Sequence, residues 1–396
     1  MKKYLSKFNI TYEFVKEATY TCLNSNNRWK RRDTKIFLAK YYQKYLEVRE
    51  NKICSRVYAV NLMNENIPQN KEKFYPVVDW IAGNIFIEII TRTIFFPPIN
   101  YDERYDNTSG KFRKIGTLSL KQQIYDYIVV LACKEMFFAK FGYYQVGAVP
   151  KKGQKFARQT IEYWTRSKPK KCRYICKADV YHFYNTVDHN VLKRLLERDI
   201  KNDDIIYVSF VLIDTFNEGL CIGSFVCQYW ANYILSYLYH YLTEKLYSER
   251  RGKRINWVNF VLFQMDDIYL FASNKKYLKM AVKAMEKYLN EELKLELKPT
   301  LQIFPLGSRP IDVVGYKIYI DKTTIRKKNY KRIKGVCKKI NKQGGKMNLF
   351  QARRIISYNG FIKYSNSHRF QKEYNIEEIM NNAKEVISND SKKCRI

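Results

Sequence analysis

Two adjacent aspartates within an apolar stretch are the residues of this sequence best suited to chemistry. Asp266 and Asp267 interrupt the segment Val261 to Phe271, in which most of the other residues are apolar. Two carboxylates side by side in such surroundings are unfavourable unless a cation compensates their charge, and a divalent metal ion is the usual solution. An exposed hairpin turn, where aspartate is favoured, is the alternative explanation for this pair.

A third aspartate ends a segment that has the pattern of a β-strand. The strand-like run Tyr174 to Asp179 is followed by several aromatic residues. A strand-end aspartate facing the hairpin pair could hold two Mg²⁺ ions, which activate a hydroxyl nucleophile and stabilise a leaving pyrophosphate. Hard oxygen ligands suit Mg²⁺, with Mn²⁺ as a substitute, and no cluster of soft ligands competes. The alternative is that Asp179 only caps a nearby helix.

The charge of the chain indicates a polyanionic partner. The 396 residues include 72 Lys+Arg and 38 Asp+Glu, a formal net charge of +34. Such a surplus attracts nucleic-acid phosphates, although an acidic substrate or an anionic membrane surface stays open. Residues 322–372 contain sixteen Lys or Arg and no acidic residue. Because apolar and aromatic residues are interleaved there, we expect a folded basic helical module rather than a solvated tail.

The elements that position the aspartates follow from hydrophobic periodicity. A hydrophobic content of 46% is ample for packed cores and excludes a wholly disordered chain. Val258 to Ala272 has the pattern of strand, turn and strand, and Ala281 to Leu293 that of an amphipathic helix. The chain up to about Asn107 has helical periodicity and ends in a proline-containing stretch and a polar loop, where we place a domain boundary.

Composition also bears on the compartment. The most apolar stretches are too short or too often interrupted by charge to span a membrane, and no signal peptide is visible. Nine cysteines scattered singly and four histidines favour a reducing interior over a disulfide framework or a zinc site. We therefore expect a soluble cytoplasmic protein without a membrane partner.

Five segments, in order along the chain, together resemble the motifs of reverse transcriptases. Gly110 to Ile115 resembles the fingers motif that holds the incoming triphosphate; Asp179 with Phe183 and Tyr184 resembles the first palm motif; Gly219 to Asn232 is similar to the Gly-Leu-Pro-Ile-Gly-x-x-x-Ser-Gln-x-x-Ala-Asn segment of bacterial members; Gln264 to Asp267 resembles the Tyr-x-Asp-Asp box; and Ile311 to Tyr316 resembles the primer-grip hairpin. No single segment would suffice, but the five in this order span about residues 110 to 370.

The resemblance implies an α+β fold of the right-hand polymerase type. It divides the chain into an N-terminal helical region at residues 1–109, fingers at 110–176, a palm at 177–320 and a basic helical thumb at 321–396. The first hundred residues do not closely resemble the family.

The resemblance also implies a role for individual residues. Asp179, Asp266 and Asp267 would be catalytic and bind two metal ions, together with the backbone carbonyl of Val180. Lys111, Arg113, Tyr184, Gly223 and Gln228 would form the deoxynucleotide site, in which Tyr184 stacks under the sugar and excludes a 2′-hydroxyl; without the motif, Tyr184 would be taken as a core aromatic. Gln264, Gly315, Tyr316 and Lys298 would handle primer and template. Lys298 is the lysine nearest to the family's possible proton donor to pyrophosphate, with an ordinary surface lysine as the alternative.

Three departures from the family pattern bear on template handling. Gln264 replaces the tyrosine of the Asp-Asp box, Cys227 a serine and Cys221 a proline. The segments Tyr143 to Gln154 and Ser357 to Asn366 resemble those of diversity-generating retroelement enzymes and of defence-associated bacterial reverse transcriptases. Because the departures lead away from the former consensus, we expect an antiviral enzyme with a dedicated noncoding RNA, and a mutagenic retroelement enzyme is the alternative.

The sequence thus predicts an RNA-directed DNA polymerase, a nucleotidyltransferase. Its partners would be a template or noncoding RNA, the cDNA duplex and deoxynucleoside triphosphates, while an accessory protein or a second copy of the chain stays open. Two other hypotheses remain: a noncatalytic RNA-binding protein on a polymerase scaffold, and a template-independent or protein-primed transferase that uses one of the 34 tyrosines.

Overall fold

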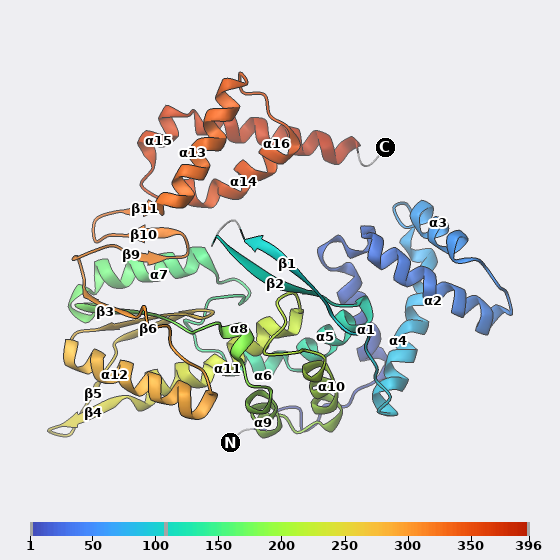
Figure 1. Ribbon diagram of the computed structural model, residues 1–396, viewed down its shortest axis with the longest axis horizontal. Helices are drawn as coiled ribbons and strands as arrows, with labels where there is room; N and C mark the ends of the chain where they lie inside the picture. Colours follow the sequence, from blue (N-terminus) through green and yellow to red (C-terminus); the bar gives the residue numbers. More distant parts are fainter. Residues whose placement is uncertain (1–2, 107–109, 394–396) are drawn as a thin grey trace. The chain divides into compact units, whose positions relative to one another are not determined.

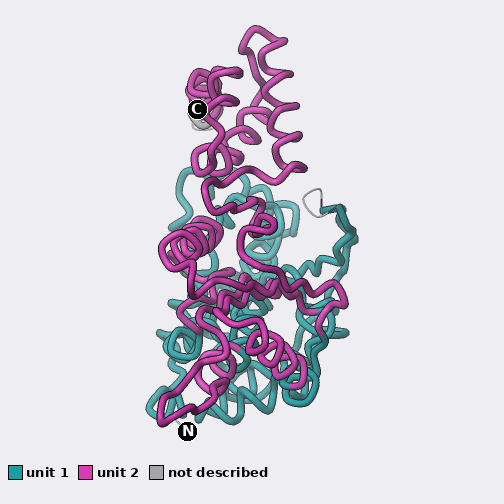
Figure 2. The backbone as a smooth tube through the Cα atoms, turned by 90° about the vertical axis from the view of Figure 1, so that its left-hand side faces the viewer, with its two compact units in different colours: residues 1–141, 181–238, 288–296 teal, residues 142–180, 239–287, 297–396 magenta. Residues whose placement is uncertain are grey.

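The computed structural model describes residues 3–106 and 110–393. The chain forms two compact units that interleave along the sequence (Figure 2). Unit 1 comprises residues 1–141, 181–238 and 288–296, and unit 2 comprises residues 142–180, 239–287 and 297–396. Because each unit draws on separate stretches of chain, the units do not coincide with the four contiguous ranges expected from the sequence. That fourfold division stays a prediction.

Unit 1 is mainly helical (Figure 1). Its helices are α1 (Tyr12–Asn24), α2 (Arg32–Glu50), α3 (Arg56–Asn66), α4 (Tyr75–Ile90), α5 (Leu120–Ala132), α6 (Lys134–Lys140), α8 (Phe183–Thr186), α9 (His189–Asp199), α10 (Asp203–Asp214) and most of α11 (Phe225–His240), with 3₁₀ turns η1 (Ser25–Lys30) and η2 (Lys71–Phe74) and a π-helical turn η5 (Leu289–Leu293). The interior includes α4 and α5, on which Val78, Ile85, Ile124 and Ile128 are all 1% exposed or less.

Unit 1 also contains a hairpin that corrects one expectation. Residues 100–106, expected to continue the helical region, form strand β1 (Asn100–Asp106), which pairs antiparallel with β2 (Lys111–Thr117). Pro97 and Pro98 precede it and prevent the helix from continuing. The expected boundary at residue 109 therefore falls between the two paired strands, and residues 107–109 lie outside the described residues.

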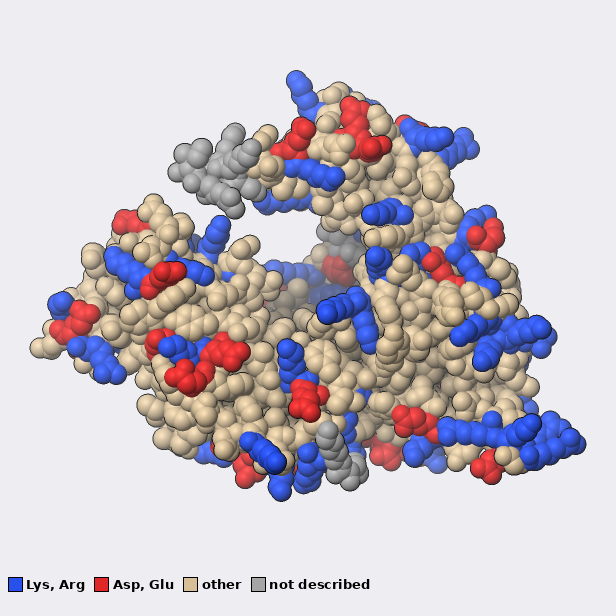
Figure 3. All heavy atoms as spheres, turned by 180° about the vertical axis from the view of Figure 1, so that it is seen from behind, with Lys and Arg blue, Asp and Glu red and all other residues tan. Residues whose placement is uncertain are grey.

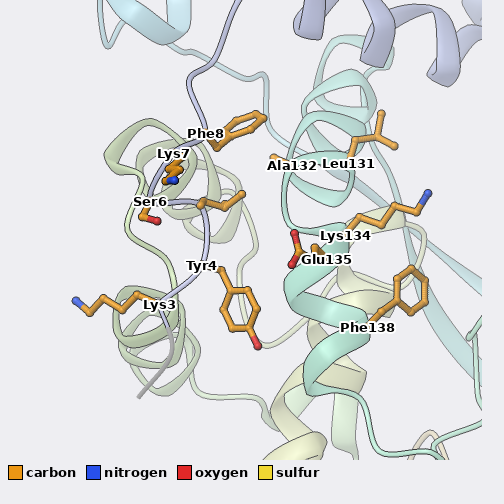
Figure 4. Close-up of a pocket in the computed structure, with 11 residues that line it drawn as sticks. Lys3, Tyr4, Ser6, Lys7, Phe8, Leu131, Ala132, Lys134, Glu135 and Phe138 are labelled. Carbon is orange, nitrogen blue, oxygen red and sulfur yellow. The ribbon is translucent and has the colours of Figure 1, made fainter.

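The chain's first described segment, residues 3–8, turns at Ser6 and Lys7 and runs beside α5 and α6 (Figure 4). The backbone N–H of Tyr4 donates to the carbonyl of Asp199 at 2.7 Å, and the N–H of Lys201 donates to the carbonyl of Tyr4 at 2.9 Å. Residues 3–8 form one side of a cavity of about 790 Å³, and Leu131, Glu135 and Phe138 belong to the other side. The two backbone hydrogen bonds of Tyr4 attach this segment to the end of α9.

Unit 2 is built on a four-stranded antiparallel sheet of order β6-β7-β3-β8. Its strands are β3 (Tyr174–Asp179), β6 (Phe260–Gln264), β7 (Asp267–Ala272) and β8 (Gln302–Pro305). In the view of Figure 1, α7 (Gln154–Ser167) lies above the strands and α12 (Lys275–Tyr288) below them. Trp164 of α7 is 1% exposed and stacks on Phe260 with ring centroids 4.7 Å apart. The strand, turn, strand and amphipathic helix predicted in this region are confirmed.

A smaller sheet and a helical module complete unit 2. The sheet has the order β11-β10-β9, from β9 (Ile311–Val313), β10 (Tyr316–Ile318) and β11 (Thr323–Ile325). The module comprises α13 (Lys327–Lys342), α14 (Leu349–Lys363), α15 (His368–Glu373) and α16 (Ile376–Lys393), and the remaining elements of the unit are η3 (Pro169–Lys171), the π-helical turn η4 (Tyr241–Lys245) and the hairpin β4 (Tyr247–Arg250) and β5 (Lys253–Asn256).

The basic C-terminal module is folded, as predicted. One face of α13 carries Ile333, Val336, Cys337 and Ile340, which are buried in a common core with residues of α14 and α16. Lysines occupy its other face, so the periodic apolar positions override the charge repulsion along the helix. Within the described residues no helix is long and apolar enough to cross a membrane.

Candidate active site

The four-stranded sheet of unit 2 brings together the three aspartates singled out from the sequence. Asp179 ends β3 and lies opposite Asp267, the first residue of β7, in the antiparallel register. Asp266 occupies the two-residue turn between β6 and β7, because Gln264 pairs with Asp267. The N–H of Val180 donates to the carbonyl of Asp266 at 3.2 Å. Sequence reasoning therefore predicted both the strand end and the hairpin on which the carboxylates lie.

The turn that carries Asp266 is held by residues 144–147. Met265 has φ of 55°, an uncommon backbone conformation for a side chain of this kind. A Cβ on Gly147 would lie 2.7 Å from the backbone nitrogen of Met265, so only glycine fits there. Phe263 exchanges backbone hydrogen bonds with Tyr144 and Val146, both at 2.9 Å. This segment thus buttresses the edge of the sheet next to the aspartates.

Lys298 contacts the carboxylate of Asp179 directly. Its Nζ lies 2.5 Å from Oδ1 of Asp179, and its backbone N–H donates to the carbonyl of Asp179 at 2.8 Å. With a side chain 27% exposed, it is not an ordinary surface lysine. The ammonium therefore supplies a positive charge at the end of β3.

A second set of charges, which the sequence did not single out, lies beside the aspartates. Asp179, Asp267 and Asp312 line a cavity of about 270 Å³ together with Lys177 and Arg309. Lys177 Nζ donates to the backbone carbonyl of Asp312 at 2.9 Å. Arg326 Nε donates to Oδ1 of Asp312 at 2.8 Å. Lys177 lies on the four-stranded sheet, whereas Asp312 belongs to the three-stranded sheet. Because folding alone brings them together, their spacing in the sequence does not predict the contact.

Negative charge is concentrated at this site. Burial, with the charges of Asp179 and Asp267, raises the pKa of Asp266 to about 6. Burial also raises the pKa of Asp267, although Lys177 opposes this effect. The nearby lysines and Arg326 therefore do not fully compensate the carboxylates. Oxygen donors with uncompensated charge are suited to a divalent cation.

The side chains are not arranged as a finished metal site. Across residues 3–106 and 110–393, no three His, Cys, Asp or Glu side chains form a ready set of metal ligands. Asp179 is instead paired with Lys298. The identity of the donors fits Mg²⁺ or Mn²⁺, because all are carboxylate or carbonyl oxygens.

Residues 311–318, which resemble the primer-grip segment, form the hairpin β9 and β10. Its turn consists of Val314 and Gly315, with φ of 41° and 88°. A Cβ on Gly315 would lie 2.6 Å from the ring of Phe361 and 2.7 Å from Nδ2 of Asn329. Tyr316 donates its hydroxyl to the carbonyl of Gly360 at 2.9 Å. The hairpin is therefore packed against α13 and α14.

Gln264 lies at the end of β6, next to the catalytic turn. Its amide oxygen is buried and has no hydrogen-bond partner within the described residues. An unsatisfied buried polar atom is unfavourable by about 1–3 kcal/mol, so this oxygen can still accept a hydrogen bond. The tyrosine that the family has at this position would offer a hydroxyl instead of this acceptor.

In unit 1, the two basic residues of the fingers motif share one face of a strand. Lys111 and Arg113 are two residues apart on β2 and are both exposed, so their side chains point the same way. Arg113 Nε contacts Oδ2 of Asp106 on the paired strand β1 at 3.1 Å. Such a pair at an exposed position contributes little stability and leaves the guanidinium available to an anion.

The end of β2 is fastened to the loop that contains Gly223. The N–H of Gly116 donates to the carbonyl of Ile222 at 2.8 Å. Gly223 has φ of 124°, and a Cβ there would lie 2.4 Å from the carbonyl oxygen of Gly116. A Cβ on Gly116 would in turn lie 2.3 Å from Sγ of Cys221. Close backbone approach thus requires glycine at position 223, and the side chain of Cys221 occupies the space beside Gly116. Helix α11, with the exposed Gln228, follows directly.

Asp126 of α5 fixes the start of α11, a role that the sequence did not reveal. Its Oδ2 accepts hydrogen bonds from Ser224 Oγ and from the N–H of Phe225, both at 2.8 Å. The carboxyl group is fully buried, which raises its pKa to about 7 despite these bonds and the charge of Arg28.

Tyr184 lies in the short helix α8 of unit 1 and is partly buried. Its carbonyl accepts a hydrogen bond from the N–H of Leu220 at 2.6 Å, and a Cβ on Gly219 would lie 2.1 Å from that oxygen. Unit 1 thus brings Tyr184 to the same loop that contains Gly223. The backbone, rather than the ring, makes this contact.

Residues 104–318, more than half of the chain, match the family model described as reverse transcriptase (RNA-dependent DNA polymerase). The chain belongs to the reverse transcriptase family. It is therefore an RNA-directed DNA polymerase, a nucleotidyltransferase, with the right-hand polymerase fold predicted from the sequence.

Solved structures give a further comparison. The structure titled apo telomerase from Candida tropicalis, truncated from its C-terminal domain, is similar over 82% of this chain and 83% of its own. The sequence identity is 14% and the TM-score 0.40. No curated protein matches the chain.

We expect Gly223→Ala to lower the enzyme's kcat/KM for deoxynucleotide incorporation about 10- to 100-fold. The added Cβ would displace the loop that contains residue 223 from β2. Steady-state kinetics with a primed RNA template measure the change. Gly153→Ala is the matched control: its φ of 103° is likewise unfavourable for alanine, but no atom lies within 4 Å of the added Cβ. Equal activity of the two variants would contradict the positioning role.

We expect Asp126→Asn to stabilise the protein at pH 8 by about 1–2 kcal/mol, because the amide removes a buried charge, although its N–H groups replace an oxygen that has no partner. The pKa of Asp126 is higher in the folded than in the unfolded wild type, so this group stabilises the folded protein at low pH. That stabilisation is lost as the pH rises through about 7. The difference from wild type should therefore shrink towards pH 4.

Urea unfolding of both proteins across this pH range provides the test. Asp321→Asn, at a side chain 72% exposed, is the control and should change stability little at any pH. A pH-independent difference for Asp126→Asn would rule out the raised pKa as its cause.

Proposed function

We propose that this reverse transcriptase synthesises DNA by phosphoryl transfer at Asp179, Asp266 and Asp267, on an RNA that it holds for that purpose. The observation that supports the chemistry best is the facing pair Asp179 and Asp267, with Asp266 in the adjoining turn. Three carboxylates gathered at one strand end, with the pKa of Asp266 raised by burial and by the charges of the other two, favour a cation-binding role over a turn-forming one.

The implied cofactor is a pair of divalent ions, Mg²⁺ with Mn²⁺ as a substitute. The three aspartates and the carbonyl of Val180 would hold them. Bound metal ions supply charge stabilisation for the attacking and leaving oxygens of an in-line displacement. In their absence Lys298 neutralises Asp179, and its proximity also suits it to protonate the departing pyrophosphate.

The residues of unit 1 would bind the incoming nucleotide. Lys111 and Arg113 present two cations on one face of β2, and a guanidinium fork suits triphosphate oxygens. Gly223 would let the backbone approach the new base pair, and the exposed amide of Gln228 would add a hydrogen bond. Tyr184 would exclude a 2′-hydroxyl and so select deoxynucleotides.

Primer and template would be held by residues of unit 2. Gly315 and Tyr316 form the hairpin packed against α13 and α14. The unsatisfied amide oxygen of Gln264 would accept a hydrogen bond from the primer or a base, which the family's tyrosine would provide differently.

Basic surfaces in unit 2 are suited to the phosphate backbone. Exposed lysines line the solvent face of α13, at residues 327, 328, 331, 338, 339 and 342. Lys and Arg side chains also gather at the tip of the β4–β5 hairpin (Figure 3), which contributes Arg250, Arg251, Lys253 and Arg254. Each phosphate neutralised by such residues adds affinity that depends on salt. This charge supports a firmly held RNA.

The proposed biological role is antiviral defence in bacteria, with a dedicated noncoding RNA as template. Its support is the sequence resemblance and the direction of the departures at Gln264, Cys221 and Cys227. A diversity-generating retroelement enzyme is the second candidate, supported by the resemblance of residues 143–154 and 357–366 to that class. An accessory protein or a second copy of the chain stays open as a partner.

Asp266→Asn and Asp267→Asn should each lower DNA synthesis by at least about 10³-fold, since a neutral amide binds a divalent ion poorly. RNA binding should stay within about twofold of wild type, because the phosphate contacts lie elsewhere. Primer extension and filter binding measure the two properties. Asp214→Asn, at a side chain 60% exposed, is the control. A parallel loss of both properties would show that the pair is structural.

Tyr184→Ala should increase incorporation of ribonucleotides relative to deoxynucleotides by about 10-fold or more, because the 2′-hydroxyl is no longer excluded. The ratio of kcat/KM values for the two sugars is the measurement. Tyr181→Ala, which removes an exposed ring from the same segment, should leave the ratio unchanged. Unaltered sugar selectivity in Tyr184→Ala would refute the gate.

The RNA and DNA that co-purify with the protein test the dedicated template. We expect one dominant RNA species and DNA complementary to part of it, identified by sequencing. DNA with dispersed substitutions would favour the retroelement alternative. A random sample of cellular RNA without complementary DNA would contradict both roles.

A further inference from the structure

Two short turns in the N-terminal part of unit 1 enclose a cavity of about 560 Å³. The first turn follows α1 and comprises residues 24–30. The second joins α3 to α4 and comprises residues 67–72. None of the family's five motifs extends into these turns, so the polymerase chemistry leaves the cavity unexplained.

The lining is rich in exposed side-chain amides. Asn24, Asn27, Gln69 and Asn70 all line the cavity. Within the described residues, the amides of Asn27, Gln69 and Asn70 form no hydrogen bond. Asn70 directly precedes η2, where asparagine usually caps a helix, yet it makes no capping bond. Asn27 has a φ of 54°, a left-handed conformation that asparagine tolerates, so backbone geometry alone explains an asparagine there. Gln69 has no positive φ and therefore no such explanation.

The wall behind these amides is fixed in advance. Trp29 is 6% exposed, and its Nε1 donates to Oδ1 of Asn24 at 3.0 Å. Lys71 Nζ donates to the same oxygen at 3.0 Å and lies 5.5 Å from the centroid of the Trp29 ring. These contacts tie the two turns together, so a ligand would meet a site that is already formed.

The charges of the lining favour a phosphate-bearing ligand. Two lysines, Lys30 and Lys71, and one acidic residue, Glu72, line the cavity. Two arginines, at positions 31 and 32, directly follow Lys30 in the chain. The lining contains no His, Cys, Ser or Thr. Its chemistry is that of recognition rather than catalysis.

We propose that this cavity binds an unpaired nucleotide of the RNA held by the enzyme, with the amides reading the base edge and the lysines contacting the adjoining phosphates. Amides offer a donor and an acceptor together, which matches the edges of nucleobases. Proteins recognise RNA sequence mainly through such splayed-out bases. The volume is within the range of small-ligand pockets. The inference rests on the proposed function, because it takes the bound RNA as the partner.

The test compares base preference in three proteins. Wild type, the triple variant Asn27→Ala/Gln69→Ala/Asn70→Ala, and the control Asn61→Ala/Asn64→Ala are titrated with fluorescent single-stranded A, C and U oligoribonucleotides of about 12 nucleotides. Both control positions are exposed amides on α3 outside the cavity. The four nucleoside monophosphates serve as the free-nucleotide arm.

Wild type and control should prefer one base, and the triple variant should lose that preference by a factor of about 10 or more. The dependence of affinity on salt should not change in the variant, because amides release no counterions. Ultraviolet crosslinks to the preferred oligomer should map to residues 24–30 or 67–72. Primer extension on a preformed template–primer should persist in the variant.

Two results would overturn the inference: an unchanged base preference in the triple variant, or crosslinks confined to other segments. Monophosphates that bind as tightly as the oligomer, with both lost in the variant, would assign the pocket to free nucleotides instead. A wild type that shows the pocket-dependent preference but no DNA synthesis would contradict the proposed function alone.

Discussion

The cross-strand register of β3 and β7 is the constraint on which the rest of the site depends. It places Asp179 opposite Asp267 and sets Asp266 in the adjoining turn. Carboxylates this close and partly buried are unfavourable in the protein alone, and the pKa of Asp266 rises to about 6. Lys298 relieves part of the charge at Asp179. The backbone geometry therefore holds three carboxylates where a cation would reduce their mutual repulsion.

The surrounding elements hold that geometry through close backbone packing. Gly147 allows residues 144–147 to pair with the edge of the sheet, and Gly315 allows the hairpin to meet the ring of Phe361. In unit 1, Gly223 and Gly116 fasten β2 to the loop before α11. At each of these glycines a neighbouring group occupies the space that a side chain would need. Each glycine therefore lets one segment pack closely against the next.

The sequence predicted the elements whose pattern is local. The strand ending at Asp179, the hairpin around Asp266 and the folded basic module follow from periodicities of two and of 3.6 residues, which a single segment displays. Residues 100–106 were misassigned because their charges mask a strand that only pairing with β2 reveals. Asp126, Asp312 and Arg326 were missed for a related reason: each acts on a partner distant in sequence or lies outside the motifs.

The central claim is that these aspartates support RNA-directed DNA synthesis with divalent metal ions. Incorporation of labelled deoxynucleotides by the purified full chain, on an RNA template with an annealed primer, tests it most directly when Mg²⁺ and Mn²⁺ are titrated in turn. The account predicts incorporation that requires both the RNA and one of these ions, and that stops when the ion is chelated. Folded, RNA-binding protein that incorporates nothing with either ion would contradict it.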